Sequence, residues 1–422
     1  MAPTSVPVPM ITRVRLKNFK SIAECDVTLG PLTILVGPNG SGKSNFLQAL
    51  DFLADAVNNG LESAVLRRGG IDSLMSRWAR GNADESLSIE IDLHLEMGRQ
   101  ATFHLAVGFS GFGGFKIIEE RCTVDPNKSR RGVESYVVNE SKQEWRNTRG
   151  YIASPPGYQE REKGMASGAL TLPFFADHVY FRPVYNAIRG FTTYAFDIVE
   201  MRRPHEFSDG QQLRSSGANI ASVMRMFPFL NESGWSPGER VLDYLAAVTP
   251  GIVDVDTRSL DAFQVLRFEQ RWSEGEQPHF FSAGEMSDGT IRALGILVAL
   301  YQRNMAGGSP VTLVAIEEPE TAVHPGAATA ILEAMAEASM TTQVLATTHS
   351  AAMLDHEDLD VEILRAVELH GGRTVIGPVD EASRRILEAH LASAGELLRM
   401  RHLSPGNGHD GSARMNEAAA PA

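Results

Sequence analysis

One glycine-rich stretch constrains this chain more than any other part of the sequence. The apolar run from Leu32 to Val36 leads directly into it, and apolar residues recur at helical spacing behind it, from Phe46 to Val57. A loop between a buried strand and the start of a helix turns backbone N–H groups towards an anion, and the helix dipole adds positive charge. The stretch therefore predicts a phosphate-binding P-loop, made of Gly37, Pro38, Asn39, Gly40, Ser41, Gly42, Lys43 and Ser44 and continued by Asn45.

Two side chains of the P-loop indicate a nucleotide rather than a simple anion. Lys43 can reach the β- and γ-phosphates, and the hydroxyl of Ser44 can ligate Mg²⁺. A chance glycine-rich turn is the alternative, but it does not explain the strand before the loop and the helix after it. We therefore expect the chain to bind a nucleotide together with a magnesium ion.

The composition narrows the class of protein. The chain has 422 residues and a hydrophobic content of 43%, enough for two or three domains or for one large domain with an insertion. Its net charge of −13 excludes a generally basic surface, so contact with nucleic acid needs a local basic patch. Only two cysteines occur, and no apolar run approaches the roughly 20 residues of a membrane span. We expect a soluble cytoplasmic protein that does not contact a membrane.

In the N-terminal third, apolar and polar residues alternate, as in strands with one face exposed to solvent. Residues 11–30 predict two short strands around a turn, residues 87–95 and 103–109 an antiparallel hairpin, and residues 117–124 a further strand. We assign residues 1–134 to the N-terminal part of one α/β unit, which holds the P-loop and this antiparallel β region.

The middle of the chain, residues 135–280, carries a weaker signal. Proline and glycine are scattered among short amphipathic pieces, and no heptad pattern persists for three or four repeats. We expect a mainly helical insertion without long coiled-coil arms. The α/β unit then continues in residues 281–385, and a terminal helix and a disordered tail follow in residues 386–422.

A second group of chemically informative residues follows this insertion. The segment from Met286 to Thr290 precedes an amphipathic helix, and an apolar strand over residues 311–316 ends in Glu317 and Glu318. The carboxyl end of a central parallel strand is a usual place for catalytic acids. Glu317 is placed to hold Mg²⁺, directly or through water, and Glu318 to accept the proton of an attacking water. The alternative is a pair of surface acids beside a turn-forming proline.

A neighbouring strand carries one more candidate. The apolar run from Val344 to Thr347 leads to His349, which we expect at the same edge of the sheet, in contact with the γ-phosphate. A lone histidine is more often structural, but its place after a parallel strand favours the functional role. Hydrolysis of a phosphoanhydride needs a phosphate cradle, a metal ion and a group that orients water. We therefore predict that Glu318, His349 and Lys43 are catalytic.

Together and in this order, the motifs resemble the ABC-type ATPase heads of the RecF, SMC and OLD group of AAA family ATPases. The resemblance extends from about residue 11 to about residue 385. It is carried by Arg15 to Ser21, Gly37 to Ser44, Gly217 to Ile220, Met286 to Thr290, Ile316 to Glu320, His324-Pro325 and Thr347 to Ser350. The resemblance implies ATP as the nucleotide and an α/β fold, a P-loop NTPase of the ABC-ATPase type with a central, mainly parallel sheet.

The resemblance also implies a homodimer that closes around ATP. The signature segment, Met286 to Thr290, would then cover the γ-phosphate bound by the Lys43 loop of the other copy, using Ser287, Asp288 and Gly289. ATP would close this dimer and hydrolysis would open it. Considered alone, a serine before a helix is an ordinary N-cap.

Three departures from the group's pattern bear on function. No glutamine occurs from residue 49 to residue 99, where the group usually has one that senses Mg²⁺. Thr321 and Ala322 stand where Asn-Gly is usual, which bears on communication between two ATP sites. Too few residues follow His349 for the Toprim domain of the OLD nucleases, so we do not expect nuclease activity.

Two functions stay open. The first is a RecF/SMC-like ATPase that engages DNA in repair or chromosome maintenance; the second is the switch subunit of a phage-defence or toxin module that acts on a separately encoded effector protein. A transporter ATPase fits less well, because nothing suggests coupling to membrane helices. Three arginine pairs are available for DNA phosphates, although such pairs more often lie on a solvated face: Arg67 and Arg68, Arg130 and Arg131, Arg202 and Arg203.

Overall fold

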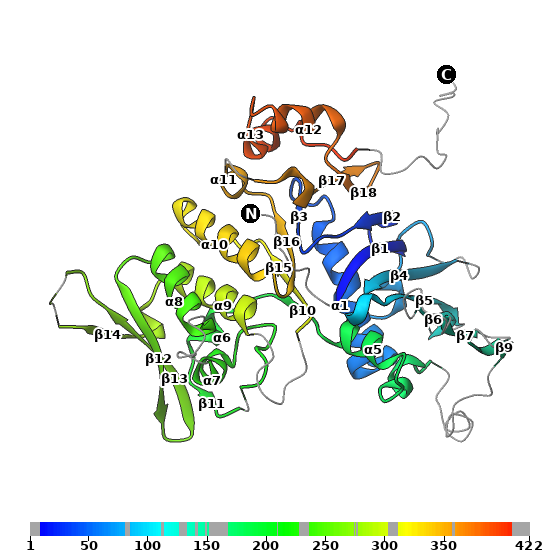
Figure 1. The fold of residues 1–422 in the computed structure, drawn as a ribbon, viewed down its shortest axis with the longest axis horizontal. Helices are drawn as coiled ribbons and strands as arrows, with labels where there is room; N and C mark the ends of the chain where they lie inside the picture. Colours follow the sequence, from blue (N-terminus) through cyan, green and yellow to red (C-terminus); the bar gives the residue numbers. More distant parts are fainter. Residues whose placement is uncertain are drawn as a thin grey trace.

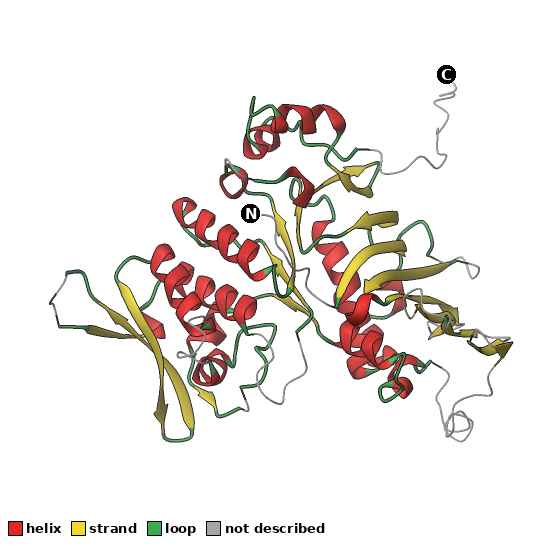
Figure 2. Cartoon of the chain, in the orientation of Figure 1, coloured by secondary structure: helices red, strands yellow, loops and turns green. Residues whose placement is uncertain are grey.

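A computed structural model shows an α/β molecule whose helices lie on both sides of a central sheet (Figure 1, Figure 2). The structure describes residues 9–80, 85–110, 114–125, 133–139, 142–147, 150–151, 168–208, 210–227, 236–273, 275, 277–302, 311–356 and 359–406. No helix among these residues is long and apolar enough to cross a membrane.

The central sheet has six strands in the order β10-β15-β16-β3-β17-β18. All neighbours are parallel except the hairpin β17–β18, so the carboxyl ends of β3, β15 and β16 meet at one edge. The register pairs Glu317 with Thr347 and Val36 with Thr348, which brings the P-loop beside the two predicted catalytic strand ends. The strands are β3 (Leu32–Val36), β10 (Phe191–Tyr194), β15 (Leu313–Glu317), β16 (Gln343–Thr348), β17 (Leu364–His370) and β18 (Arg373–Pro378).

Alternate residues of the central strands point into two separate hydrophobic cores. Leu35 and Ala315 belong to the core that contains α1, whereas Ile34, Val36 and Ile316 belong to the core that contains α9 and α10. On the α1 side lie α1 (Lys43–Asn59), α2 (Leu61–Arg67), α3 (Ile71–Leu74) and α5 (Arg182–Arg189). On the α9 side lie α6 (Ile198–Arg202), α7 (Ile220–Met226), α8 (Pro237–Val248), α9 (Asp288–Tyr301), α10 (Pro325–Ala338) and α11 (Ala351–Leu354).

An antiparallel sheet of eight strands covers the core on the α1 side, in the order β2-β1-β4-β5-β6-β7-β8-β9. The buried side chain of Gln343 fastens β1 to the central sheet, because it donates to the carbonyls of Ile11 and Gly30 and accepts from the Ile11 N–H. The strands are β1 (Met10–Phe19), β2 (Ile22–Thr28), β4 (Ser86–His94), β5 (Gln100–Ser110), β6 (Gly114–Asp125), β7 (Glu134–Asn139), β8 (Lys142–Asn147) and β9 (Gly150–Tyr151). The predicted hairpins of the N-terminal third are confirmed.

The segment 135–280, expected to be mainly helical, holds strands as well as helices. Its strand β10 lies in the central sheet, and a small sheet of β11 (His205–Glu206), β12 (Ile252–Leu260), β13 (Phe263–Gln270) and the following β14 (His279–Ser282) lies at the far end of the α9 side (Figure 1). Short strands such as β10 give almost no periodic signal, because four residues complete only two alternations. The predicted arginine pair at residues 130–131 and the part of the predicted tail beyond residue 406 lie outside the described residues.

The chain returns over the P-loop end of the molecule at its C-terminal part. The single helix expected there is two helices, α12 (Glu381–Glu388) and α13 (Ala394–Arg399). His390 has a left-handed φ of 51° and Ser393 caps the second helix, which explains the break. Four short 3₁₀ turns complete the described elements: η1 (Glu96–Gly98), η2 (Leu172–Phe175), η3 (Ala283–Glu285) and η4 (Val361–Ile363).

Candidate nucleotide-binding and hydrolysis site

The P-loop backbone fits only the glycines that the sequence supplies. A Cβ on Gly37 would stand 2.1 Å from the Val367 carbonyl oxygen. Gly42, which precedes the first residue of α1, has φ 103°, and a Cβ there would meet the Thr374 hydroxyl at 2.0 Å. The loop is therefore held between β3 and the β17–β18 hairpin in a form that leads into the N-terminus of α1.

Lys43 lies inside this loop. Its side chain is largely buried, and Nζ donates to the carbonyls of Gly37 (2.7 Å) and Pro38 (3.0 Å). Burial lowers the pKa of Lys43, and the nearby carboxylates of Glu318, Glu320 and Glu317 oppose that shift. An ammonium group with little hydration, already folded against the loop, is suited to bind phosphate oxygens.

Ser44 and Glu317 meet across the sheet. Ser44 Oγ donates to Glu317 Oε2 at 2.8 Å, although the two residues are 273 positions apart. A hydroxyl and a carboxylate so close together at a helix N-terminus fit a Mg²⁺ ion that also takes phosphate oxygens and waters. The two residues predicted as metal ligands are thus brought together.

The edge continues with Glu318 and His349. His349 Nδ1 lies 3.0 Å from Glu318 Oε1, and the two side chains are 39% and 37% exposed. Glu318 has a left-handed φ of 46°, a conformation that costs a non-glycine residue of order 1–3 kcal/mol. Its N–H donates to the Thr347 carbonyl at 3.0 Å. A strained, partly exposed carboxylate beside a histidine can accept a proton from a water that reaches this edge.

The signature segment makes local contacts instead. Ser287 caps α9, because its Oγ accepts from the Thr290 N–H at 3.1 Å. Asp288 pairs with Arg202 at 2.6 Å. Gly289 faces the chain after β15, where a Cβ would stand 2.4 Å from the Ala322 carbonyl oxygen. In one chain, these polar groups are directed to their own helix and its neighbours.

The remaining predicted nucleotide contact also has a partner within the chain. Asn45 Nδ2 donates to Ser21 Oγ at 2.6 Å, which ties the start of α1 to the turn between β1 and β2. Its role towards a nucleotide stays a prediction. No residue is assigned as the magnesium-sensing glutamine. The strand β10 ends beside the predicted catalytic acids, because Tyr194 pairs in parallel with Ile316.

Sequence reasoning missed Arg292 altogether and assigned Arg202 to DNA phosphates rather than to the signature segment. Arg292 of α9 donates through Nη2 to the carbonyls of Glu317 (3.0 Å) and Glu318 (3.1 Å). Arg202 of α6 donates to the Met286 carbonyl at 2.6 Å, besides its pair with Asp288. Only the fold brings these side chains to the motifs. The one sequence signal was the place of Arg292, just after the signature segment.

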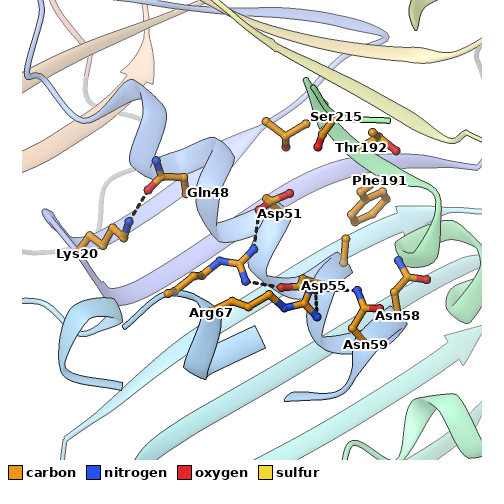
Figure 3. Close-up of a pocket in the computed structure, with 13 residues that line it drawn as sticks. Lys20, Gln48, Asp51, Asp55, Asn58, Asn59, Arg67, Phe191, Thr192 and Ser215 are labelled. Carbon is orange, nitrogen blue, oxygen red and sulfur yellow. Dashed lines mark hydrogen bonds and ion pairs between the residues drawn. The ribbon is translucent and has the colours of Figure 1, made fainter. Parts of the chain in front are cut away.

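Two of the three arginine pairs considered for DNA lie among the described residues, and both are engaged within the protein. Arg68 binds Asp51 and Asp55, and Arg67 lies 3.2 Å from Asp55. These residues line a polar pocket of about 620 Å³ beside α1, where Lys20 donates to Gln48 (Figure 3). The other described pair is engaged too, since Arg202 holds the signature segment and Arg203 binds Glu200 at 2.6 Å. Arg68 and Arg202, which are mostly covered, are weak candidates for binding phosphate. Arg67 and Arg203 are 52% and 61% exposed, and a phosphate can replace the partner in such a surface pair at little cost.

The fold and this edge define the class of protein, an ABC-type ATPase head of the RecF, SMC and OLD group. The chain belongs to the AAA_21 family, described as "AAA domain, putative AbiEii toxin, Type IV TA system", whose model matches residues 32–136 and 193–355. The resemblance inferred from the motifs is confirmed at this level.

The individual relatives match over short lengths. The OLD nuclease of Thermus scotoductus is 36% identical over 87 residues, which are 21% of this chain and 15% of that protein. The DNA replication and repair protein RecF of Corynebacterium jeikeium is 35% identical over 104 residues, 24% of this chain and 21% of that protein. A crystal structure of an SMC head bound to the C-winged helix domain of ScpA has a TM-score of 0.52 at 14% identity and covers 89% of this chain and 100% of that chain. The last match shows the fold alone.

Proposed function

We propose that this protein binds and hydrolyses ATP with Mg²⁺, as an ATP-sandwiched homodimer, and that it works in DNA repair or chromosome maintenance. One observation carries the enzymatic part of this proposal. The fold brings Lys43, Ser44 paired with Glu317, and Glu318 paired with His349 to a single sheet edge from three different strands.

The geometry supports a division of roles. Lys43 and the P-loop amides bind phosphate oxygens, and Ser44 and Glu317 would hold the metal ion, which would offset the negative charge of the phosphates. The Glu318 carboxylate accepts the proton of the attacking water. His349, which contacts Glu318 at 3.0 Å, orients that carboxylate and senses the γ-phosphate.

The dimer is supported by what one chain leaves incomplete. Ser287 and Gly289 lie at the start of α9, an ABC-type signature position, where Ser287 caps the helix and Gly289 packs against the Ala322 carbonyl, so within one chain neither serves a nucleotide. A second copy related by two-fold symmetry would place each signature segment over the other P-loop. The buried, unpaired state of Cys25 and Cys122 supports a reducing, cytoplasmic location.

A switch subunit that acts on a separate effector protein is the second candidate. The family description, which names a toxin of a toxin–antitoxin system, favours it. The pairing of the largely covered Arg68 and Arg202 with acids favours it too, because these two arginines are not free to contact DNA phosphates.

ATP turnover with and without duplex DNA, at a stated moderate salt concentration, tests the function. Glu318→Gln is expected to lower turnover by about 10²- to 10⁴-fold, since the proton acceptor is lost. Glu333→Gln, a change of an exposed acid on α10, is the matched control and leaves turnover unchanged. Stimulation by DNA supports the repair function, and turnover that ignores DNA favours the effector switch. Full turnover in Glu318→Gln would remove the catalytic assignment.

A further inference from the structure

The backbone at the catalytic glutamate is held in a disfavoured form. Glu318 is the first residue beyond β15, and its φ of 46° lies in the left-handed region, which a residue with a Cβ rarely adopts. On the β16 side, the N–H of Glu318 is bound to the Thr347 carbonyl at 3.0 Å. A strained conformation persists only where the surroundings over-determine it, so the carbonyl side needs support as well.

Arg292 supplies that support. It projects from α9, and a single terminal nitrogen, Nη2, reaches the carbonyl oxygens of Glu317 at 3.0 Å and Glu318 at 3.1 Å. The side chain is partly buried, and its buried Nε has no hydrogen-bond partner among the described residues. The two carbonyls lie on either side of the Glu318 Cα. A planar, rigid group that binds both restricts the backbone torsions of Glu318, and so fixes the direction in which its side chain leaves the backbone.

We propose that Arg292 is a positioning residue for hydrolysis, which holds Glu318 in its left-handed conformation and ties the catalytic carboxylate to the helix that begins with the signature segment. The proposal deepens the proposed function and rests on it, because Glu318 is the catalytic group of that function. Arg292 itself acts on the backbone and not on the nucleotide.

The helix α9 also links the Glu318 loop to the signature segment. The start of α9 is packed against the chain after β15, where Gly289 faces the Ala322 carbonyl, while Arg202 binds the Met286 carbonyl and Asp288. The loop that carries Glu318 is thus fixed to α9 at Arg292 and again at Gly289. A displacement of the signature segment, such as closure on a second copy would cause, moves the catalytic loop of the same chain.

Steady-state kinetics on Arg292→Met and Arg292→Lys form the first test. We expect Arg292→Met to lower kcat by roughly 10- to 100-fold, the size of effect that misplacing a catalytic group produces, with the KM for ATP changed less than about threefold. Arg292→Lys, which can still donate to a carbonyl, recovers part of kcat. The matched control is Arg240→Met, which removes an arginine that joins α8 to Glu337 of α10 and leaves kcat unchanged. Equal losses in all three variants would overturn the proposal.

A double-variant cycle separates positioning from a general structural role. If Arg292 acts through Glu318, adding Arg292→Met to Glu318→Gln causes little further loss in single-turnover hydrolysis. If Arg292 only stabilises the fold, the two losses multiply, and the proposal fails.

Hydrogen exchange on the nucleotide-free protein distinguishes failure of this proposal from failure of the proposed function. We expect the amide of Glu318 to exchange faster in Arg292→Met than in the wild type, and to be unchanged in Arg240→Met. Unchanged exchange in Arg292→Met overturns the positioning role whether or not the protein hydrolyses ATP. If the wild type shows no turnover but the Glu318 amide exchanges faster in Arg292→Met, the proposed ATPase activity is refuted, and the support of the backbone by Arg292 still holds.

Discussion

Glu318 follows the strand β15 and Glu120 lies within the strand β6, and the surroundings of the two carboxylates differ. Glu318 is 37% exposed, and its closest partner is His349 at 3.0 Å. Glu120, in β6, is fully buried and accepts three hydrogen bonds: from the Tyr136 hydroxyl (2.7 Å), the Thr171 N–H (2.6 Å) and the Leu172 N–H (2.8 Å). Burial raises the pKa of Glu120, and the hydrogen bonds from the Thr171 and Leu172 backbones and from the Tyr136 and Thr171 side chains oppose that shift.

The difference separates the proposed catalytic acid from a structural one. The acceptor capacity of Glu120 is used within the fold, where it attaches the segment after residue 168 to the antiparallel sheet. Glu318 keeps acceptor capacity and access to water in a strained backbone. Changes at the nucleotide edge should therefore alter activity with little effect on stability, and changes at Glu120 should do the reverse.

Lys43→Met should have the largest effect at the nucleotide edge. Without the ammonium group, ATP affinity should fall at least about 100-fold, because the phosphate charge loses its buried partner. The free energy of unfolding should stay within about 1 kcal/mol, since a desolvated charge is also removed. Calorimetric titration with MgATP measures the affinity, and Lys17→Met, an exposed change on β1, is the control. Retained affinity in Lys43→Met would break the comparison.

Glu120→Ala should act on stability alone. It leaves two backbone N–H groups and the Tyr136 hydroxyl without an acceptor in the core, so the free energy of unfolding should fall by about 3 kcal/mol. Urea denaturation measures the loss. Glu119→Ala changes the partly exposed neighbour on β6 and should cost less than about 1 kcal/mol. A drop in the kcat of the folded protein, rather than in stability, would contradict the assignment.

The pH dependence of stability should show that Glu120 is a buried acid. Its pKa is higher folded than unfolded, so the folded state binds more protons between the ordinary carboxyl value of 4.5 and the folded value. Stability contributed by the protonated group is therefore present at low pH and lost as the pH rises through the folded pKa. Relative to Glu120→Gln, the wild type should lose up to about 1.4 kcal/mol per pH unit in this window. A difference between the two proteins that does not vary with pH would exclude the shift.

Mixing two inactive variants should give the smallest change in turnover. It tests whether the nucleotide site is complete in one chain or needs the signature segment of a second copy. Lys43→Met and Ser287→Ala should each be nearly inactive alone. Mixed at equal amounts, they should regain about a quarter of wild-type turnover, since half of a random set of two-fold dimers has one intact composite site out of two. No regain under conditions where the subunits exchange would mean that the signature segment does not serve a second copy.

Much of the candidate site could be predicted from the sequence, because its parts are local. The P-loop is one continuous segment in which close approaches require glycine at positions 37 and 42, where a Cβ would stand 2.1 Å and 2.0 Å from the nearest atom. Glu317, Glu318 and His349 each follow an apolar run, and parallel strands bring such ends together. The four-residue strand β10 escaped prediction because so short a run has no readable period.

The sequence by itself determined the loop that holds a phosphate, the acids at the strand end and the family, since each depends on neighbouring residues whose chemistry shows in their order. Only the tertiary structure decided which charged side chains are paired within the protein and which stay accessible to a ligand. It bonded Arg67, Arg68 and Arg202 to acids, enclosed Glu120 with three donors, and placed Arg292 on the carbonyls of Glu317 and Glu318. These pairings join residues far apart in the chain, and the free energy of a charge depends on the distance to its partners and on its burial, which the order of residues does not record.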